Sequence, residues 1–221
     1  MSQNERITGQ IAVHKTHTKL IEFIDNLNPA PITDYASIHA GAARPCEHEG
    51  KRVYSTIRII AQDYSRKGEL SVRVRANISP AEVAYLASAI KYEPVHGFKY
   101  ESEKIYGKPD EHGYSPVTKL WVTRFKTDET SVNKPAQPWR VDIENGRGIK
   151  TVDENGGTFC QPGTYEQEKK VFLNLSGFEF FSLMVAVERF VNLWEISHAP
   201  NLIREGQEAR NASWAKKNNT Q

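Results

Sequence analysis

The sequence is poor in cysteine, with only Cys46 and Cys160 among its 221 residues. A disulfide framework is therefore not what stabilises this chain, although a single disulfide stays open. The sequence also lacks an apolar run near the roughly 20 residues that a membrane-spanning helix requires. Its first residues, Met1 to Arg6, do not have the basic and then apolar regions of a secretory signal. We therefore expect a folded cytoplasmic protein with no membrane partner.

The motifs of common enzyme classes are missing as well. The sequence contains no G-x-S-x-G, no phosphate loop ending in G-K-[ST], no H-E-x-x-H and no G-x-G-x-x-G. The pair Cys46-x-His48, with His39 or Cys160 as a further ligand, does not match the spacing of paired zinc knuckles. Asp142 and Glu144 share a strand face, which suits acid-base chemistry but is also typical of a solvated face. We predict no catalytic residue, no metal and no cofactor; a site assembled from distant segments is the alternative that remains.

The charge of the chain is small overall but unevenly distributed. Residues 51–126 contain 14 lysine and arginine residues against 8 acidic ones, whereas the whole chain has a net charge of +2. Such an asymmetry indicates a face that binds a polyanion, although surface charge also fluctuates along any chain. The hydrophobic content of 38% and the charged content of 25% are those of a globular protein.

Two segments share a pattern in which a strand runs directly into a helix. In each segment a serine at the start of the helix is followed three residues later by a glutamate, the sequence of a capping box. Alternating apolar residues precede the serine and indicate a strand with one buried face. The matching residues are Asn77, Ser79, Glu82 and Leu86 in the first segment, and Asn174, Ser176, Glu179 and Leu183, each 97 positions later, in the second.

The remaining elements follow from periodicity and turn residues. We expect a short amphipathic helix over residues 17–27, a hairpin formed by strands 52–62 and 70–78, and a helix over 79–92. The pattern in the second half of the sequence predicts an antiparallel meander followed by a long helix from Gly177 to about Ser197. Pro200 is expected to end or break this helix. The expected strands of the meander are 98–106, 117–126, 139–144, 149–152 and 169–175, with turns at Asn145-Gly146 and Asn155-Gly156-Gly157.

Strands followed by a helix, twice over, predict an α+β fold with antiparallel sheets packed against helices. We expect an N-terminal extension over residues 1–50, a single domain over 51–200 made of two pseudo-repeats (51–95 and 96–200), and a C-terminal helix with a frayed tail over 201–221. Residues 7–13 are a candidate further strand of the first repeat.

On the residues 72–90 and 169–190, the chain resembles the single-stranded-DNA-binding proteins of the Whirly and positive-cofactor-four superfamily. That resemblance implies two β-β-β-β-α repeats whose curved sheets face unpaired nucleic acid, in an oligomeric protein. The stretch from Tyr54 to Ser65, Y-S-T-I-R-I-I-A-Q-D-Y-S, also resembles an uncharacterised family carried on conjugative elements of Firmicutes. The second resemblance implies an accessory protein of a mobile element.

Binding of a single strand requires cations along the phosphates and aromatic rings on which bases stack. Tyr54, Arg58, Arg73 and Arg75 occupy the outward positions of the first predicted hairpin, because the alternate positions are apolar. In the same way, Lys119 and Trp121 lie opposite Leu120 and Val122. The alternative for the aromatic residues is packing beneath a loop or subunit.

We therefore predict a sequence-tolerant, non-enzymatic protein that binds single-stranded DNA, with RNA left open as a partner. The arginines and Lys119 would neutralise phosphates, and Tyr54 and Trp121 would stack bases. We also expect a homo-oligomer. The alternative function is a protein-interaction or assembly module, in which Phe190, Val191 and Trp194 of the last helix pack against another subunit.

Overall fold

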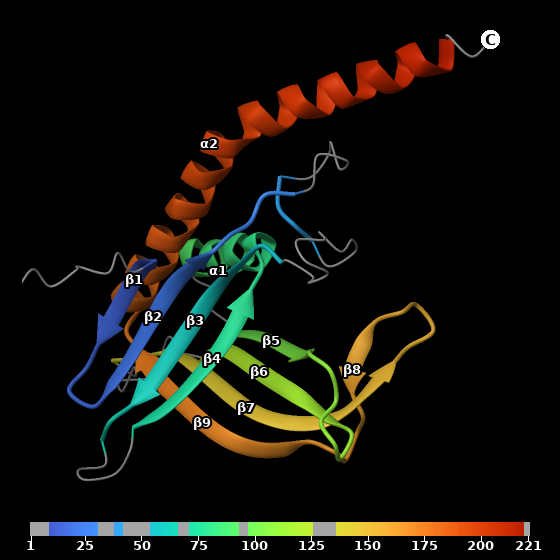
Figure 1. The fold of residues 1–221 in the computed structure, drawn as a ribbon. Helices are drawn as coiled ribbons and strands as arrows, with labels where there is room; N and C mark the ends of the chain where they lie inside the picture. The colour runs from blue at the N-terminus through green and yellow to red at the C-terminus, as the bar shows by residue number, and fades with distance from the viewer. Residues whose placement is uncertain are drawn as a thin grey trace, which may run out of the picture.

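The chain forms two antiparallel sheets and two helices, which confirms the predicted α+β class (Figure 1). This computed structural model describes residues 9–30, 38–41, 54–65, 71–92, 97–125 and 136–218. The first sheet has the order β1-β2-β3-β4 and continues into α1. Its elements are β1 (Gln10–Lys15), β2 (Lys19–Asn26), β3 (Thr56–Asp63), β4 (Val72–Ile78) and α1 (Pro80–Lys91).

The second sheet is built in the same sequential way. Its strands pair in the order β5-β6-β7, β9 pairs with the first part of β7, and the short β8 pairs with the end of β7. The chain then continues from β9 into α2. The elements are β5 (Phe98–Ile105), β6 (Tyr114–Arg124), β7 (Trp139–Val152), β8 (Thr158–Cys160), β9 (Glu166–Leu175) and α2 (Gly177–Asn218).

The helix predicted over residues 17–27 is wrong, because Lys19–Asn26 within this range form β2. Leu20, Ile21, Ile24 and Leu27 have helical spacing, but Ile21 and Phe23 also alternate with Glu22 at the period of a strand. β2 pairs with β3 along its whole length, from Lys19 opposite Asp63 to Asn26 opposite Thr56. Ile21 and Phe23 are almost fully buried. Part of the predicted N-terminal extension therefore belongs to the first sheet, and the candidate strand over residues 7–13 corresponds in part to β1.

The hairpin turn predicted at Asn145-Gly146 is also wrong, because β7 runs through both residues. The Asn145 side chain receives a hydrogen bond from the Arg75 backbone N–H at 2.9 Å and donates one to the Arg75 carbonyl at 2.8 Å. It therefore joins the edge of β4 to the second sheet. Gly146 is required by close packing, since a Cβ there would lie 2.1 Å from the Glu166 carbonyl oxygen. The break predicted at Asn155-Gly156-Gly157 is confirmed as the turn between β7 and β8.

The long helix does not end at Pro200, and the C-terminal helix predicted separately within residues 201–221 is part of α2. Figure 1 shows α2 bent between two halves, with the C-terminal half extending away from both sheets. Pro200 has no backbone N–H and clashes with the preceding turn, so it bends a helix that otherwise continues. Residues 219–221 of the predicted tail lie outside the described residues.

Both predicted capping boxes are present. The Ser79 hydroxyl accepts the Glu82 backbone N–H at 3.2 Å, and Glu82 accepts the Ser79 backbone N–H at 2.5 Å. Ser176 and Glu179 form the same two bonds at 3.2 and 2.7 Å. Each bond satisfies an amide that would otherwise lack a partner at the start of a helix.

The core lies between the inner faces of the two sheets and the helices. Residues separated by 97 positions are buried together in it. They are Val74 and Val171, Ala76 and Leu173, Ile78 and Leu175, Val83 and Phe180, Leu86 and Leu183, Ala87 and Met184, and Ile90 and Val187.

Candidate nucleic-acid interface

The outer face of the first sheet holds three of the predicted site residues. Arg58 on β3 lies opposite Asn77 on β4, while Arg73 and Arg75 occupy the next two outward positions of β4. The intervening residues Val74 and Ala76 are buried, as the alternation along the strand predicts. Arg58, Arg73 and Arg75 therefore share one face.

Cations dominate this outer face among the described residues. Lys15 on β1 lies in the same cross-strand row as Arg73, because Lys15 pairs with Leu20, Leu20 with Gln62, and Gln62 with Arg73. The carboxylate of the face is Glu22, which lies 3.6 Å from an Arg73 nitrogen and accepts a hydrogen bond from Gln10. The Arg73 side chain nevertheless keeps 60% of its surface exposed. Four cations, Lys15, Arg58, Arg73 and Arg75, thus stand against one carboxylate, an excess that suits a polyanion.

Arg58 differs from the two arginines of β4 because it is half-buried. Its Nε atom is buried and has no hydrogen-bond partner among the described residues. A buried donor without an acceptor costs about 1–3 kcal/mol.

Tyrosine rings lie near both ends of β3. Tyr54, which precedes the strand, is 40% exposed. Tyr64 follows the strand and donates its hydroxyl to the Thr16 and Lys19 carbonyls at 2.8 and 3.0 Å. The Lys15 ammonium lies 5.9 Å from the centre of the Tyr64 ring. At about 3.3 Å per residue, the two tyrosines are roughly 30 Å apart along the strand direction, so the arginines lie between two aromatic residues.

Lys119 and Trp121 lie on the outer face of the second sheet, apart from the three arginines. The structure confirms that they share a face, since Leu120 and Val122 between them are buried. The Lys119 ammonium lies 3.1 Å from Glu103 and 3.9 Å from the centre of the Tyr165 ring. It therefore already has an anionic and an aromatic partner.

Carboxylates balance the cations on this second face. Trp121 lies between Glu101 of β5 and Asp142 of β7 in the sheet register. Asp142 binds Arg140 at 2.9 Å, and Glu144 binds Lys170 at 2.7 Å. Among the described residues that the strand register places around Trp121, the cations are Lys99, Lys119, Arg140 and Lys170, and the carboxylates are Glu101, Glu103, Asp142 and Glu144.

The pair Asp142 and Glu144, considered above for acid-base chemistry, is buried and held in ion pairs. The hydrogen bond to Glu144 raises the pKa of Lys170. Burial, together with the negative charge of Glu144, raises the pKa of the Tyr165 hydroxyl. Both groups therefore keep their protons at neutral pH, and the arrangement stabilises the sheet by ion pairing.

Other polar residues considered at the sequence level have structural contacts. His39 contacts the Ser55 hydroxyl at 2.8 Å and Glu195 at 2.9 Å, and Cys160 is buried. Cys46 and His48 lie outside the described residues. Over the described ranges, no group of three or more histidine, cysteine, aspartate or glutamate side chains could hold a metal ion.

The residues proposed for an intersubunit contact have packing partners within the chain. Val191 is buried in the core, and Phe190 packs against it. The Trp194 ring stacks between His39 and His198, with ring centres 4.7 and 4.0 Å apart. These three side chains therefore hold α2 against its own domain.

The sequence interpretation missed Lys15 as part of the cationic face. The alternation of Ile21 and Phe23 around Glu22 could have revealed β2, and hence β1 as the neighbouring strand that carries Lys15. No family, curated protein or solved structure compared with the chain matches it. In the part of the chain that the structure describes, no helix is both long and apolar enough to cross a membrane.

Proposed function

We propose that this protein binds single-stranded DNA, without strong sequence preference, on the outer face of its first sheet. The observation that supports this proposal is the excess of cations on that face, with Lys15, Arg58, Arg73 and Arg75 against Glu22. Arginine and lysine side chains neutralise phosphates in any sequence, because the backbone charge does not depend on the bases. Tyr54 would stack a base at one end of the face.

The order of the elements supports the Whirly-like part of the proposal. Four antiparallel strands in sequential order precede each helix, with β8 as an addition to the second set. We propose that these are two copies of one β-β-β-β-α unit. On the outer faces, Arg73 and Arg75 correspond to Lys170 and Phe172, 97 positions later.

The two outer faces would then have different roles. The first keeps an excess of cations, whereas Lys119 and Trp121 lie on a face whose charges balance. We propose Arg58, Arg73, Arg75 and Tyr54 as the main contacts, with Lys119 and Trp121 as secondary ones. The resemblance to proteins of conjugative elements further suggests an accessory of a mobile element, where transferred DNA is transiently single-stranded.

Fluorescence anisotropy tests the proposal. A fluorescein-labelled oligonucleotide of 20 thymidines is titrated with the protein at 50 mM salt, beside a duplex and an RNA of the same length. The proposal predicts that the unpaired DNA binds more tightly than the duplex, and that binding weakens at 200 mM salt. Absence of binding to the unpaired DNA at 50 mM salt would contradict the proposal.

A second candidate function is assembly through α2. Phe178, Leu193 and Ile196 are 79%, 59% and 69% exposed, and together they present apolar surface along the helix. Large exposed apolar patches are typical of protein interaction sites. Light scattering tests this candidate with an Ile196→Glu, Leu193→Glu variant. An oligomer that is lost while circular dichroism stays unchanged would support assembly; a monomeric parent protein would contradict it.

A further inference from the structure

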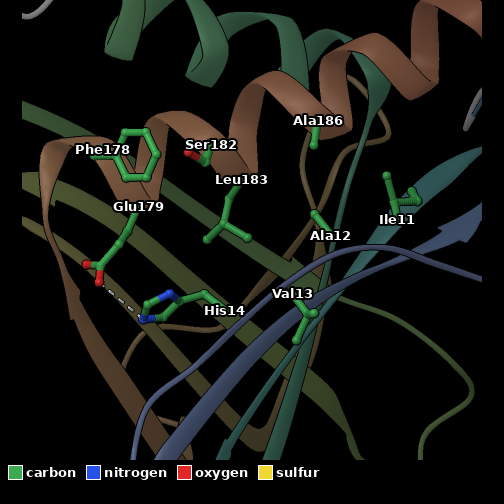
Figure 2. Close-up of a pocket in the computed structure, with 9 residues that line it drawn as sticks. All are labelled: Ile11, Ala12, Val13, His14, Phe178, Glu179, Ser182, Leu183 and Ala186. Atoms are coloured by element: carbon green, nitrogen blue, oxygen red, sulfur yellow. Dashed lines mark ion pairs between the residues drawn. The ribbon is translucent and has the colours of Figure 1, made fainter.

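A groove runs between β1, at the edge of the first sheet, and the N-terminal half of α2 (Figure 2). Two adjoining cavities of about 300 and 420 Å³ make up the groove and share Ile11 and Ala186 in their walls. Figure 2 shows Ser182 and Ala186 on the helix, Ala12 on the strand, and His14 facing Glu179. The groove therefore has small side chains at Ala12, Ser182 and Ala186, between larger ones such as Ile11 and Leu183, and an ionisable pair at one end.

The corresponding place in the other half of the molecule is filled by aromatic side chains. There α1 packs beside β5, and the Tyr85 ring lies 5.8 Å from the Phe98 ring and 6.2 Å from the Tyr100 ring. The Tyr100 hydroxyl donates a hydrogen bond to Glu82 at the start of α1. The Lys104 ammonium also binds Glu82, at 2.9 Å.

The sheet registers identify which residues correspond. Tyr85 of α1 corresponds to Ser182 of α2, 97 positions later. Tyr100 pairs with Val122, which pairs with Val141; Ala12 pairs with Phe23, which pairs with Ile59. Ile59 pairs with Ala76 of β4, and Val141 pairs with Leu173 of β9, which lies 97 positions after Ala76. Ile59 therefore corresponds to Val141, and Ala12 corresponds to Tyr100. The groove is thus the place where two tyrosine rings have been replaced by a serine and an alanine.

The hydrogen-bond acceptor for a phenol is retained in the groove. Glu179 corresponds to Glu82, and each caps its helix through one carboxylate oxygen. The other oxygen of Glu82 accepts Tyr100 and Lys104. The other oxygen of Glu179 lies 3.7 Å from His14 Nε2, too far for a hydrogen bond. The bond from the Ser176 backbone N–H lowers the pKa of Glu179, so the carboxylate is ionised at neutral pH.

We propose that the groove binds a tyrosine side chain of a partner protein, with its ring between β1 and α2 and its hydroxyl donating to Glu179. The partner segment is extended, because the groove follows the edge of β1. Phe178, which is 79% exposed at the same end, would cover the ring. The proposal rests on the two-unit interpretation of the fold but does not depend on DNA binding.

Nuclear magnetic resonance with small probes tests the proposal. Methyl signals of Ile11, Val13 and Leu183 are followed while N-acetyl-tyrosine amide or N-acetyl-phenylalanine amide is added to the full chain. We expect saturable shifts with a dissociation constant on the order of 1 mM for the tyrosine probe, and weaker binding of the phenylalanine probe. Absence of saturable shifts would overturn the proposal, as would stronger shifts with adenosine, which would indicate a base-binding site.

Two variants locate the interaction. Glu179→Gln keeps the capping bond, because glutamine also serves in a capping box, and should weaken the tyrosine probe about tenfold while leaving the phenylalanine probe unchanged. The double variant Ser182→Tyr, Ala12→Tyr introduces the tyrosines that α1 and β5 carry at the corresponding positions, and it should abolish binding of both probes. If that variant does not fold, the Glu179→Gln comparison decides: equal affinities of the parent and variant proteins for the tyrosine probe would contradict the proposal.

Discussion

Lys91 of α1 and Glu188 of α2 form an ion pair, and the two residues are 97 positions apart, as Ser79 and Ser176 are. Corresponding residues of two similar units meet where an approximate two-fold axis passes between them. The two helix starts are related in the same way, since Glu82 contacts Tyr100 of β5 and Glu179 faces His14 of β1. Each helix start thus contacts the first strand of the opposite half, as the proposed pair of units requires.

Loss of either capping serine should have the same effect. We expect Ser79→Ala and Ser176→Ala each to lower the free energy of unfolding by about 1 kcal/mol, because each removes one bond to a helix amide. Urea denaturation followed by circular dichroism measures both. Ser197→Ala is the matched control, since the Ser197 hydroxyl is exposed and bonds the carbonyl of Trp194 within the helix. A loss confined to one capping serine would contradict the equivalence of the two helix starts.

Acid should destabilise the protein partly through Glu82. Partial burial acts to raise the pKa of Glu82, but the bonds from Ser79, Tyr100 and Lys104 outweigh it and hold the pKa below its ordinary value of 4.5. A carboxyl with a lowered pKa in the folded state stabilises that state above pH 4.5, and this contribution is lost as the pH falls through the folded pKa.

The parent protein should therefore lose stability below pH 4.5 more steeply than Glu82→Gln. Thermal unfolding at several pH values between 7 and 3 measures the difference. Parallel curves for the two proteins would show that Glu82 does not contribute to the pH dependence.

Gly146 should not tolerate a side chain. We expect Gly146→Ala to cost about 3 kcal/mol, because its Cβ would overlap the Glu166 carbonyl where β9 shifts register against β7. Gly41→Ala is the control, since no atom of the described residues lies within 4 Å of a Cβ there. Chemical denaturation compares the two variants. Equal midpoints would mean that β7 and β9 do not pack so closely.

Local chemistry made most of the fold predictable. Ser79 with Glu82, and Ser176 with Glu179, marked two helix starts, and the alternation of Val74 and Ala76 with arginines marked β4. The errors arose where tertiary packing decided between two patterns. Asn145-Gly146 is a common turn sequence, yet here the asparagine binds the backbone of another strand and the glycine allows close approach.

The candidate site was predictable only in part, for a similar reason. Alternation along one strand assigns Arg73 and Arg75 to an outward face. It does not show which strand lies beside it, so the carboxylates around Lys119 and Trp121 could not be foreseen. Glu103 and Asp142 reach that face from different strands.

Trp194 should stabilise the domain rather than an oligomer. We expect Trp194→Ala to lower the free energy of unfolding by about 2–3 kcal/mol, because the ring stacks between His39 and His198. Ile196→Ala should change stability by less than about 0.5 kcal/mol, since this side chain is largely exposed. Calorimetry measures both. A larger effect of Ile196→Ala would contradict the packing described for this part of α2.

The salt dependence of DNA binding tests the role of the first sheet most directly. The affinity for an oligonucleotide of 20 thymidines is measured from 50 to 200 mM salt for the parent protein, for Arg73→Gln with Arg75→Gln, and for a control of equal charge on the C-terminal half of α2, Arg204→Gln with Arg210→Gln. The plot of log affinity against log salt should become shallower by about 1.4 for the first variant, because each lost phosphate contact removes about 0.7. The control should keep the slope of the parent. An unchanged slope in the Arg73, Arg75 variant, or no binding by the parent protein, would contradict the assignment of DNA binding to this face.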